Sequence, residues 1–186
     1  TINSTGSGIR VQNCGGGTKT FSNSTKTLNT GSNNGVTLSN NTGAIINFTN
    51  GGLDIDCTSG IGFAATGGGT VSVQGAGNSI LTTTGTALNV ANTTIGASNL
   101  TFQSISAGTA ANGPTNGIIL NSTGSSGGLV VSGTGTAGTG GTIRKCGIGI
   151  SLNSTINVSL SWMQLNDFTD FAIRGSSVIG FTLASS

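Results

Sequence analysis

The stretch "NGIILNSTGSSGGLVVS", residues 116–132, places a short apolar segment on either side of a run rich in glycine and serine. Because Ile118 and Leu120 alternate with Ile119, we expect Ile118 and Leu120 to face a core and Ile119 to face outward. The same pattern, a glycine followed by alternating apolar residues, recurs along the chain at similar but unequal intervals. Its copies begin at Gly8, Gly35, Gly60, Gly85, Gly117 and Gly149, with a degenerate copy at Asp170.

Two further apolar segments follow each of these glycines. The second segment has the same alternation, as in Ile46 with Phe48 and Val71 with Val73. In the first four copies the same number of residues separates the glycine from the third segment, which contains Leu28, Ile55, Ile80 and Ile105. Each unit therefore predicts three short strands with glycine, serine, asparagine and threonine between them.

One such unit cannot bury the apolar face of its own strands, whereas parallel stacking of units buries all of them. We therefore expect an all-β chain, a right-handed parallel β-helix of about seven coils of roughly 21–32 residues with three short strands per coil. Residues 1–186 then form a single domain. An antiparallel sandwich or meander has similar turn spacing, but the third strand's regular return to the glycine motif favours the solenoid.

Glycine is expected at the corners of the coils, where the chain turns sharply and often needs a positive φ. Asparagine tolerates the same left-handed conformation. We therefore expect left-handed corners at Asn89, Asn121 and Asn153, which follow the apolar residues of the first segment.

The composition excludes several classes of function. Only 5% of the residues are charged, and a net charge of +2 from six basic residues forms no basic patch. We therefore expect no nucleic-acid partner. No apolar run approaches the length of a membrane span, so we expect no membrane insertion.

Three segments carry a resemblance to a known family. They are "GTALNVANTTIGASNLTFQSISAG", "NGIILNSTGSSGGLVVSGTGTAGTGGTI" and "GIGISLNSTINVSLSWMQLND". Together they resemble the right-handed β-helix repeats of very large bacterial secreted and surface proteins, of the adhesin or autotransporter-passenger kind. The resemblance covers most of the chain from Gly85 onward and is weak before it. It implies an extracellular or cell-surface stalk or adhesive segment, and it fixes no catalytic residue.

Two groups of carboxylates are the candidates for chemistry. Asp54 and Asp56 flank the inward Ile55 and should project outward together, but their expected neighbours in the adjacent coils supply no cation. These neighbours are Thr27, Asn29, Ser79 and Leu81.

The second group consists of Asp167, Asp170 and Arg174, near the last coil. Carboxylates with basic residues on one face suit polysaccharide cleavage, but Asp167 and Asp170 have the sequence context of turn residues. Histidine and tyrosine, two common general bases, are absent. We therefore expect no enzyme and no cofactor.

The three cysteines, Cys14, Cys57 and Cys146, are expected to lie in coils too far apart to pair. Free thiols at buried or corner positions are the preferred interpretation, with a disulfide or an intermolecular link as the alternative. A metal site is not expected, since the chain has no histidine and no CxxC motif.

The second segment of each coil has an outward side rich in hydroxyl and amide groups. Such an uncharged face suits binding of sugars, ordering of water against ice, or packing on another fibre. Valine and glutamine interrupt the threonine spacing that ice binding needs. The candidate contact residues are Thr20, Asn47, Ser72, Thr101, Ser159 and Thr182, together with Ile119 of the first segment.

Neither end of the sequence carries an amphipathic helix or a charged coil that would cover a terminal strand edge. We therefore expect both ends to be continued, by flanking repeats or by stacked copies of the chain. The expected function is a structural or adhesive module, a stalk or filament subunit, with a glycan or another cell-surface molecule as candidate ligand. Ice binding and polysaccharide binding or cleavage are the alternatives.

Overall fold

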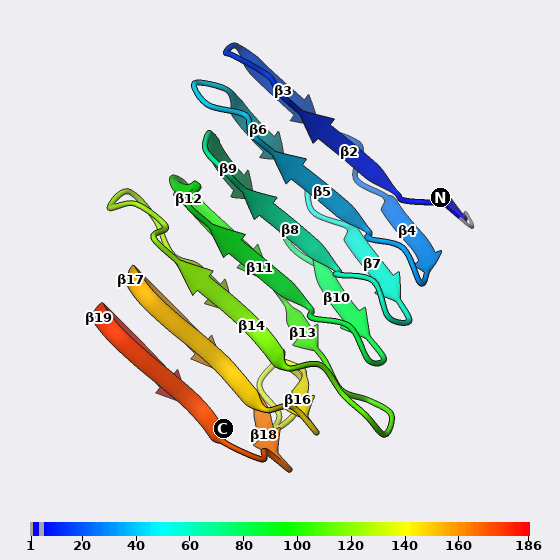
Figure 1. Ribbon diagram of the computed structural model, residues 1–186, viewed down its shortest axis with the longest axis vertical. Helices are drawn as coiled ribbons and strands as arrows, with labels where there is room; N and C mark the ends of the chain where they lie inside the picture. The colour runs from blue at the N-terminus through cyan, green and yellow to red at the C-terminus, as the bar shows by residue number, and fades with distance from the viewer. Residues whose placement is uncertain (1, 4–5) are drawn as a thin grey trace.

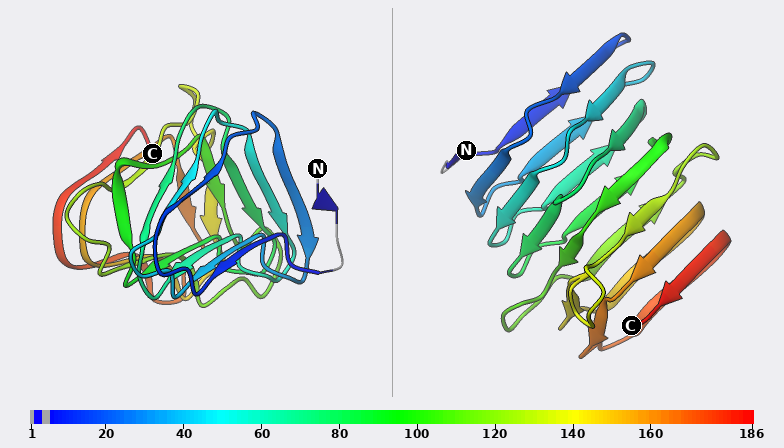
Figure 2. Two further views of the ribbon diagram at one scale, coloured as in Figure 1. Left: turned by 90° about the horizontal axis from the view of Figure 1, so that it is seen from above. Right: turned by 180° about the vertical axis from the view of Figure 1, so that it is seen from behind.

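The computed structural model describes residues 2–3 and 6–186 as a stack of parallel strands with no helix among them (Figure 1). The chain winds into a β-solenoid of about seven coils. Seen from the N-terminal end, it turns clockwise as it recedes toward the C-terminus, so the solenoid is right-handed (Figure 2). The prediction of a parallel β-helix is confirmed.

Each coil contributes one strand to each of three faces, which we call face 1, face 2 and face 3 in chain order. Face 1 contains β2 (Ile9–Gln12), β5 (Val36–Ser39), β8 (Phe63–Thr66), β11 (Leu88–Ala91) and β14 (Asn116–Asn121). Face 2 contains β3 (Thr18–Phe21), β6 (Ile45–Phe48), β9 (Thr70–Val73), β12 (Thr94–Phe102) and β15 (Leu129–Val131). Face 3 contains β1 (Ile2–Asn3), β4 (Lys26–Gly31), β7 (Leu53–Cys57), β10 (Ser79–Thr82), β13 (Ser104–Ser106), β16 (Thr142–Arg144) and β18 (Gln164–Asn166).

In the last two coils the strand continues through the corner between face 1 and face 2. These long strands are β17 (Ile148–Ser161) and β19 (Phe171–Ala184), which pair with each other along both faces. Because β17 joins the two faces, their strands form one continuous hydrogen-bonded sheet.

The register shows where the repeat begins in each coil. Ile9 aligns in turn with Val36, Phe63, Leu88, Ile118, Ile150 and Ile173. Three of the predicted copies were therefore placed too early in the chain. The residues equivalent to Gly8 are Gly62, Ala87 and Ala172, and not Gly60, Gly85 and Asp170.

Close packing explains why glycine precedes the first strand in most coils. A methyl group on Gly35 would lie 2.4 Å from Cγ2 of Ile55, and one on Gly62 would lie 2.4 Å from Cγ2 of Ile80. The isoleucine of face 3 thus occupies the space of the missing side chain. Gly60 lies in a turn instead. Because both positions are glycine, the glycine pattern by itself placed the start of this coil too early.

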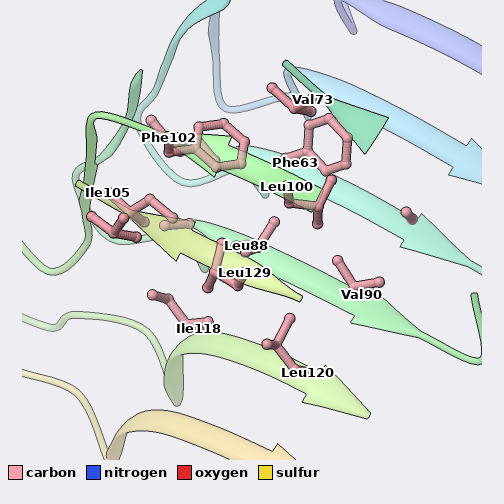
Figure 3. Packing of buried hydrophobic residues seen from close by; sticks show 14 of the residues in the cluster. Phe63, Val73, Leu88, Val90, Leu100, Phe102, Ile105, Ile118, Leu120 and Leu129 are labelled. Carbon is pink, nitrogen blue, oxygen red and sulfur yellow. The ribbon is translucent and has the colours of Figure 1, made fainter. Parts of the chain in front are cut away.

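The interior is a single cluster of apolar side chains from all three faces (Figure 3). Near the N-terminal end, phenylalanines stack along the axis, with the rings of Phe21 and Phe48 nearly parallel and 4.7 Å apart. Phe63 contacts both Phe48 and Phe102 edge to face. The inward assignments of Ile118 and Leu120 are confirmed, since both are fully buried.

A left-handed residue follows the face 1 strand at the corner to face 2 in every coil. These residues are Asn13, Asn40, Gly67, Asn92, Ser122, Ser154 and Ser177, all with φ between 47° and 76°. The expected positions Asn89, Asn121 and Asn153 were wrong, because none of them has a positive φ and the left-handed residue comes later, at Asn92, Ser122 and Ser154. Backbone pairing of the strand continues through Asn121 and Asn153, and the turn begins one residue later.

Candidate functional site

The polar residues predicted on face 2 form two short columns. Thr20 aligns with Asn47, and Asn47 aligns with Ser72. Thr101, Val130, Ser159 and Thr182 form the second column. A bulge at residues 96–99 of β12 separates the two columns, because Ile95 aligns with Val71 whereas Leu100 aligns with Val73. The predicted contact face is therefore not one continuous row.

Ser72 does not belong to the surface, although the alternation of β9 predicted it there. Its side chain is only 4% exposed. The bulge of the next coil covers it, since a methyl group on Gly96 would lie 2.5 Å from the Ser72 hydroxyl oxygen. The alternating pattern of β9 cannot predict the burial of Ser72, because the residues that cover it belong to an irregular segment of another coil.

Ile119 faces outward as predicted and is half-buried. It lies on face 1, between Asn89 and Ser151 of the neighbouring coils. It is therefore separated by a corner from the candidate residues of face 2.

A hollow of about 420 Å³ lies at the corner between face 2 and face 3. Its walls are the turn at residues 75–77 and the residues Thr101, Gln103, Ser132 and Gly133. These come from three consecutive coils. Of the predicted contact residues only Thr101 takes part, so sequence reasoning missed this site. The glycines of "QGAGN" marked a turn but gave no sign of a hollow beside it.

Asn78 holds this corner in place from inside. Its side chain is fully buried, and its amide nitrogen donates to the carbonyl oxygens of Gln74, Gly75 and Thr101 at 3.0–3.3 Å. Its side-chain oxygen accepts a hydrogen bond of 2.9 Å from the backbone of Leu53. One amide therefore connects three coils, and its polar atoms are paired as burial requires.

Lys26 is the buried charged residue of the first coil. Its ammonium group donates to the carbonyl oxygens of Asn23, Thr49 (2.9 Å) and Gly51 (2.5 Å). Burial lowers the pKa of this amine, because carbonyl dipoles replace water around it only in part.

Asp54 and Asp56 project together from face 3, next to the four neighbours that the sequence predicted. The hydroxyl of Ser79 donates to an oxygen of Asp54 at 2.6 Å. The pKa of Asp56 is raised, first by burial and second by the nearby Asp54 carboxylate. Threonine, asparagine, serine and leucine surround the pair in register, so no cation from these neighbours balances it.

The second carboxylate group does not converge into a cleft. Asp167 and Asp170 are exposed in the loop between β18 and β19, and Asp167 has φ of 58°. Arg174 lies on face 1, where its guanidinium carbon is 5.9 Å from the centre of the Phe171 ring.

All three cysteines are free thiols. Cys57 and Cys146 are buried and Cys14 is partly exposed. Burial raises the pKa of Cys57, and it raises the pKa of Cys146 to about 11. Over the described residues 2–3 and 6–186, no cluster of histidine, cysteine or carboxylate side chains could hold a metal ion.

The last coil exposes side chains that earlier coils bury. Phe181 and Leu183 of β19 continue the inward column of face 2, yet they are 39% and 41% exposed. Ile179 is 71% exposed and Phe171 is also at the surface, whereas their partners in β17, Ile156 and Ile148, are half-buried. A smaller hollow of about 290 Å³ lies beside Phe181, and its other walls are Leu152, Ile173, Gly175, Ser177 and Val178.

Comparisons with protein-family models, with curated proteins and with solved structures find no match to this chain. A helix long and apolar enough to cross a membrane is absent from the part of the chain that the structure describes.

Proposed function

We propose that this chain is a structural and adhesive module of an extracellular assembly, a stalk or filament segment of the kind found in large bacterial surface proteins. The observation that carries the proposal is the apolar surface of the last coil. In the coils before it, the next coil buries the equivalent side chains: Leu160 of β17 is buried, whereas its partner Leu183 is exposed.

The fold suits a mechanical role. Parallel ladders connect the coils on all three faces, with a single bridge from Ala107 to Ile143 between β13 and β16, and one apolar cluster runs through them. Extension or bending of such a rod has to break backbone hydrogen bonds and expose apolar surface together. Few charged groups interrupt the faces, which leaves hydroxyl and amide groups for contacts outside the cell.

The partner at the C-terminal face is another β-helix coil, from flanking repeats or from a second copy. Among the described residues, β19 pairs with β17 alone. Its other edge therefore offers backbone donors and acceptors in the spacing of a parallel strand. Phe171, Ile179 and Phe181 supply apolar area beside that edge.

No specific observation favours ice binding or polysaccharide cleavage. The hydroxyl row expected of an ice-binding face is divided by the bulge at 96–99, by buried Ser72 and by Val130. The polysaccharide-cleaving alternative required Asp167, Asp170 and Arg174 to meet in a cleft, and these side chains lie apart on an exposed loop and on face 1.

Analytical ultracentrifugation of residues 1–186 over a range of concentrations tests the proposal. We expect reversible association of the native chain, and filaments or rods by electron microscopy. Ile179→Lys should suppress association, because it places a charge beside the exposed apolar side chains of β19. Leu81→Lys is the matched control, since Leu81 is also exposed, at 44%, but lies on face 3 away from the end. A chain that stays monomeric at every concentration contradicts self-association.

A further inference from the structure

The hollow between face 2 and face 3 has the chemistry of a carbohydrate site. We propose that it binds a neutral, unbranched polysaccharide segment that lies along the solenoid axis. This inference deepens the adhesive part of the proposed function, and rests on it, by naming the class of ligand and the residues that hold it.

The walls of the hollow are uncharged, and they combine polar groups with apolar surface. Gln103 supplies an amide, Thr101 and Ser132 supply hydroxyl groups, and the turn at 75–77 supplies backbone groups. A phosphate, a nucleic acid or an acidic peptide would find no cation among these residues. A ligand made of hydroxyl groups can exchange hydrogen bonds with every one of them.

The hollow has the spacing of a repeating ligand. The turn at 75–77 belongs to the third coil, Thr101 and Gln103 to the fourth, and Ser132 and Gly133 to the fifth. Stacked strands repeat at about 4.8 Å along the axis. A pyranose ring in a linear chain advances by a similar distance, so each coil can face one sugar ring. A volume of about 420 Å³ suits a segment of two or three rings.

Trp162 of the sixth coil lies next to Gly133, which is one of the residues that line the hollow. Its side chain packs against Gly133, where an added methyl group would lie 2.8 Å from Cδ1 of the indole. Trp162 is half-buried, so part of the side chain stays accessible to solvent. An indole with a partly accessible apolar surface suits the C–H groups of a sugar ring. It is the only tryptophan in the chain.

The residues of the hollow are held in place by hydrogen bonds within the protein, so the site is preorganised. Asn78 fixes the turn at 75–77 through its hydrogen bonds to Gly75 and Thr101. Backbone hydrogen bonds from Gln103 to Asn78 and from Gly133 to Gln103 join the three coils at this corner. A rigid site loses little conformational entropy on binding. Gly77 leaves the space open, since nothing lies within 4 Å of the position that its side chain would take.

The test uses Trp162 fluorescence and titration calorimetry on the native chain. The probes are cellohexaose, maltohexaose and chitohexaose as neutral hexamers, and hexagalacturonate as the charged comparison. We expect at least one neutral hexamer to change the emission saturably with a Kd of about 1 mM, as a shallow site implies. Hexagalacturonate should bind at least about tenfold more weakly, because no wall residue balances its carboxylates.

Two matched variants locate the binding. Gly77→Asn puts an amide into the hollow, and asparagine tolerates the φ of +69° at this position. Gly31→Asn is the control, because Gly31 has φ of +57° and the same open surroundings but lies on face 3 at the end of β4. We expect Gly77→Asn to weaken the binding of the neutral hexamer at least about tenfold, and Gly31→Asn to leave it unchanged.

Two results would overturn the inference: no saturable heat or emission change with any neutral hexamer, or equal affinity in Gly77→Asn and in the native chain. Sedimentation of the same samples separates this inference from the proposed module. Association through the last coil can persist when sugar binding fails, and sugar binding can persist in the Ile179→Lys variant.

Discussion

Lys26 and Asn78 occupy the same corner of the solenoid two coils apart. Each side chain donates a hydrogen bond to the carbonyl oxygen of a residue that lies the same number of positions later in the sequence. For Lys26 this acceptor is Thr49, and for Asn78 it is Thr101. The aligned residue between them is Leu53, whose backbone nitrogen donates to Asn78. An ammonium group in one coil and an amide in the other thus donate hydrogen bonds to the inward carbonyl oxygens where the chain turns from face 2 to face 3.

Asn78→Ala should destabilise the chain strongly. The change leaves the Leu53 amide and the carbonyl of Thr101 without their partner in a buried corner, at a cost of about 2–4 kcal/mol. Equilibrium urea unfolding followed by circular dichroism measures the loss. Gln12→Ala, on the exposed end of β2, should change the free energy of unfolding by less than about 0.5 kcal/mol. Equal effects of the two variants would show that Asn78 has no special structural role.

Gly62→Ala should overpack the interior. The new methyl group would lie 2.4 Å from Cγ2 of Ile80 and 2.6 Å from the backbone oxygen of Ala87, so both coils have to move. We expect a loss of about 2–3 kcal/mol in the free energy of unfolding. Gly15→Ala is the control, because nothing lies within 4 Å of its added methyl group, and its stability should be unchanged or slightly raised. A neutral Gly62→Ala would contradict the register described for face 1.

Alkaline pH should destabilise the chain through Cys146. Its folded pKa of about 11 lies above the ordinary value of 9.0, so the folded thiol keeps a proton that the unfolded thiol loses. This contribution is therefore complete below about pH 9 and declines as the pH rises toward 11. Lys26 acts in the opposite direction, since its lowered pKa makes stability rise with pH in the range below 10.5.

The difference between the native chain and Cys146→Ala isolates the thiol, because both retain Lys26 and Cys57. Urea midpoints measured across the alkaline range should fall more steeply in the native chain. Parallel curves would mean that Cys146 titrates in the same way in both states.

Thiol accessibility should differ among the cysteines. Iodoacetamide at neutral pH is expected to label Cys14 and to spare Cys57 and Cys146, which are buried and keep their protons. Peptide mass spectrometry after a short exposure identifies the labelled site, and labelling in urea shows that all three can react. Rapid labelling of Cys146 in the folded chain would place its thiol at the surface.

Much of the fold could be predicted from period-two spacing, because each inward side chain stacks on an equivalent one in the next coil. Ile55, Ile80 and Ile105 are buried at the spacing that the sequence showed. The neighbours of Asp54 and Asp56 also followed from that spacing. The copies at Gly60 and Gly85 were misplaced because these glycines belong to turns just before the strand, and only the strand register identifies Gly62 and Ala87 as the equivalent residues.

The candidate site was beyond such reasoning. Ser72 is covered by an irregular bulge, and the hollow is formed by corners whose lengths differ from coil to coil. Trp162 and Gly133 are distant in sequence and meet only because their coils are adjacent. Contacts between corners depend on loop conformation, which alternating hydrophobicity does not encode.

The left-handed corner between face 1 and face 2 makes this chain divisible into interchangeable segments. Its φ is kept in every coil, whether the residue is asparagine, glycine or serine, while the length of chain before the next such corner varies. A segment cut from one of these corners to the next, such as residues 41–67, carries one strand of each face and begins and ends in the same backbone geometry. Duplication or deletion of such segments changes the length of the molecule in steps of about 4.8 Å. Length can thus change by recombination without redesign of any corner.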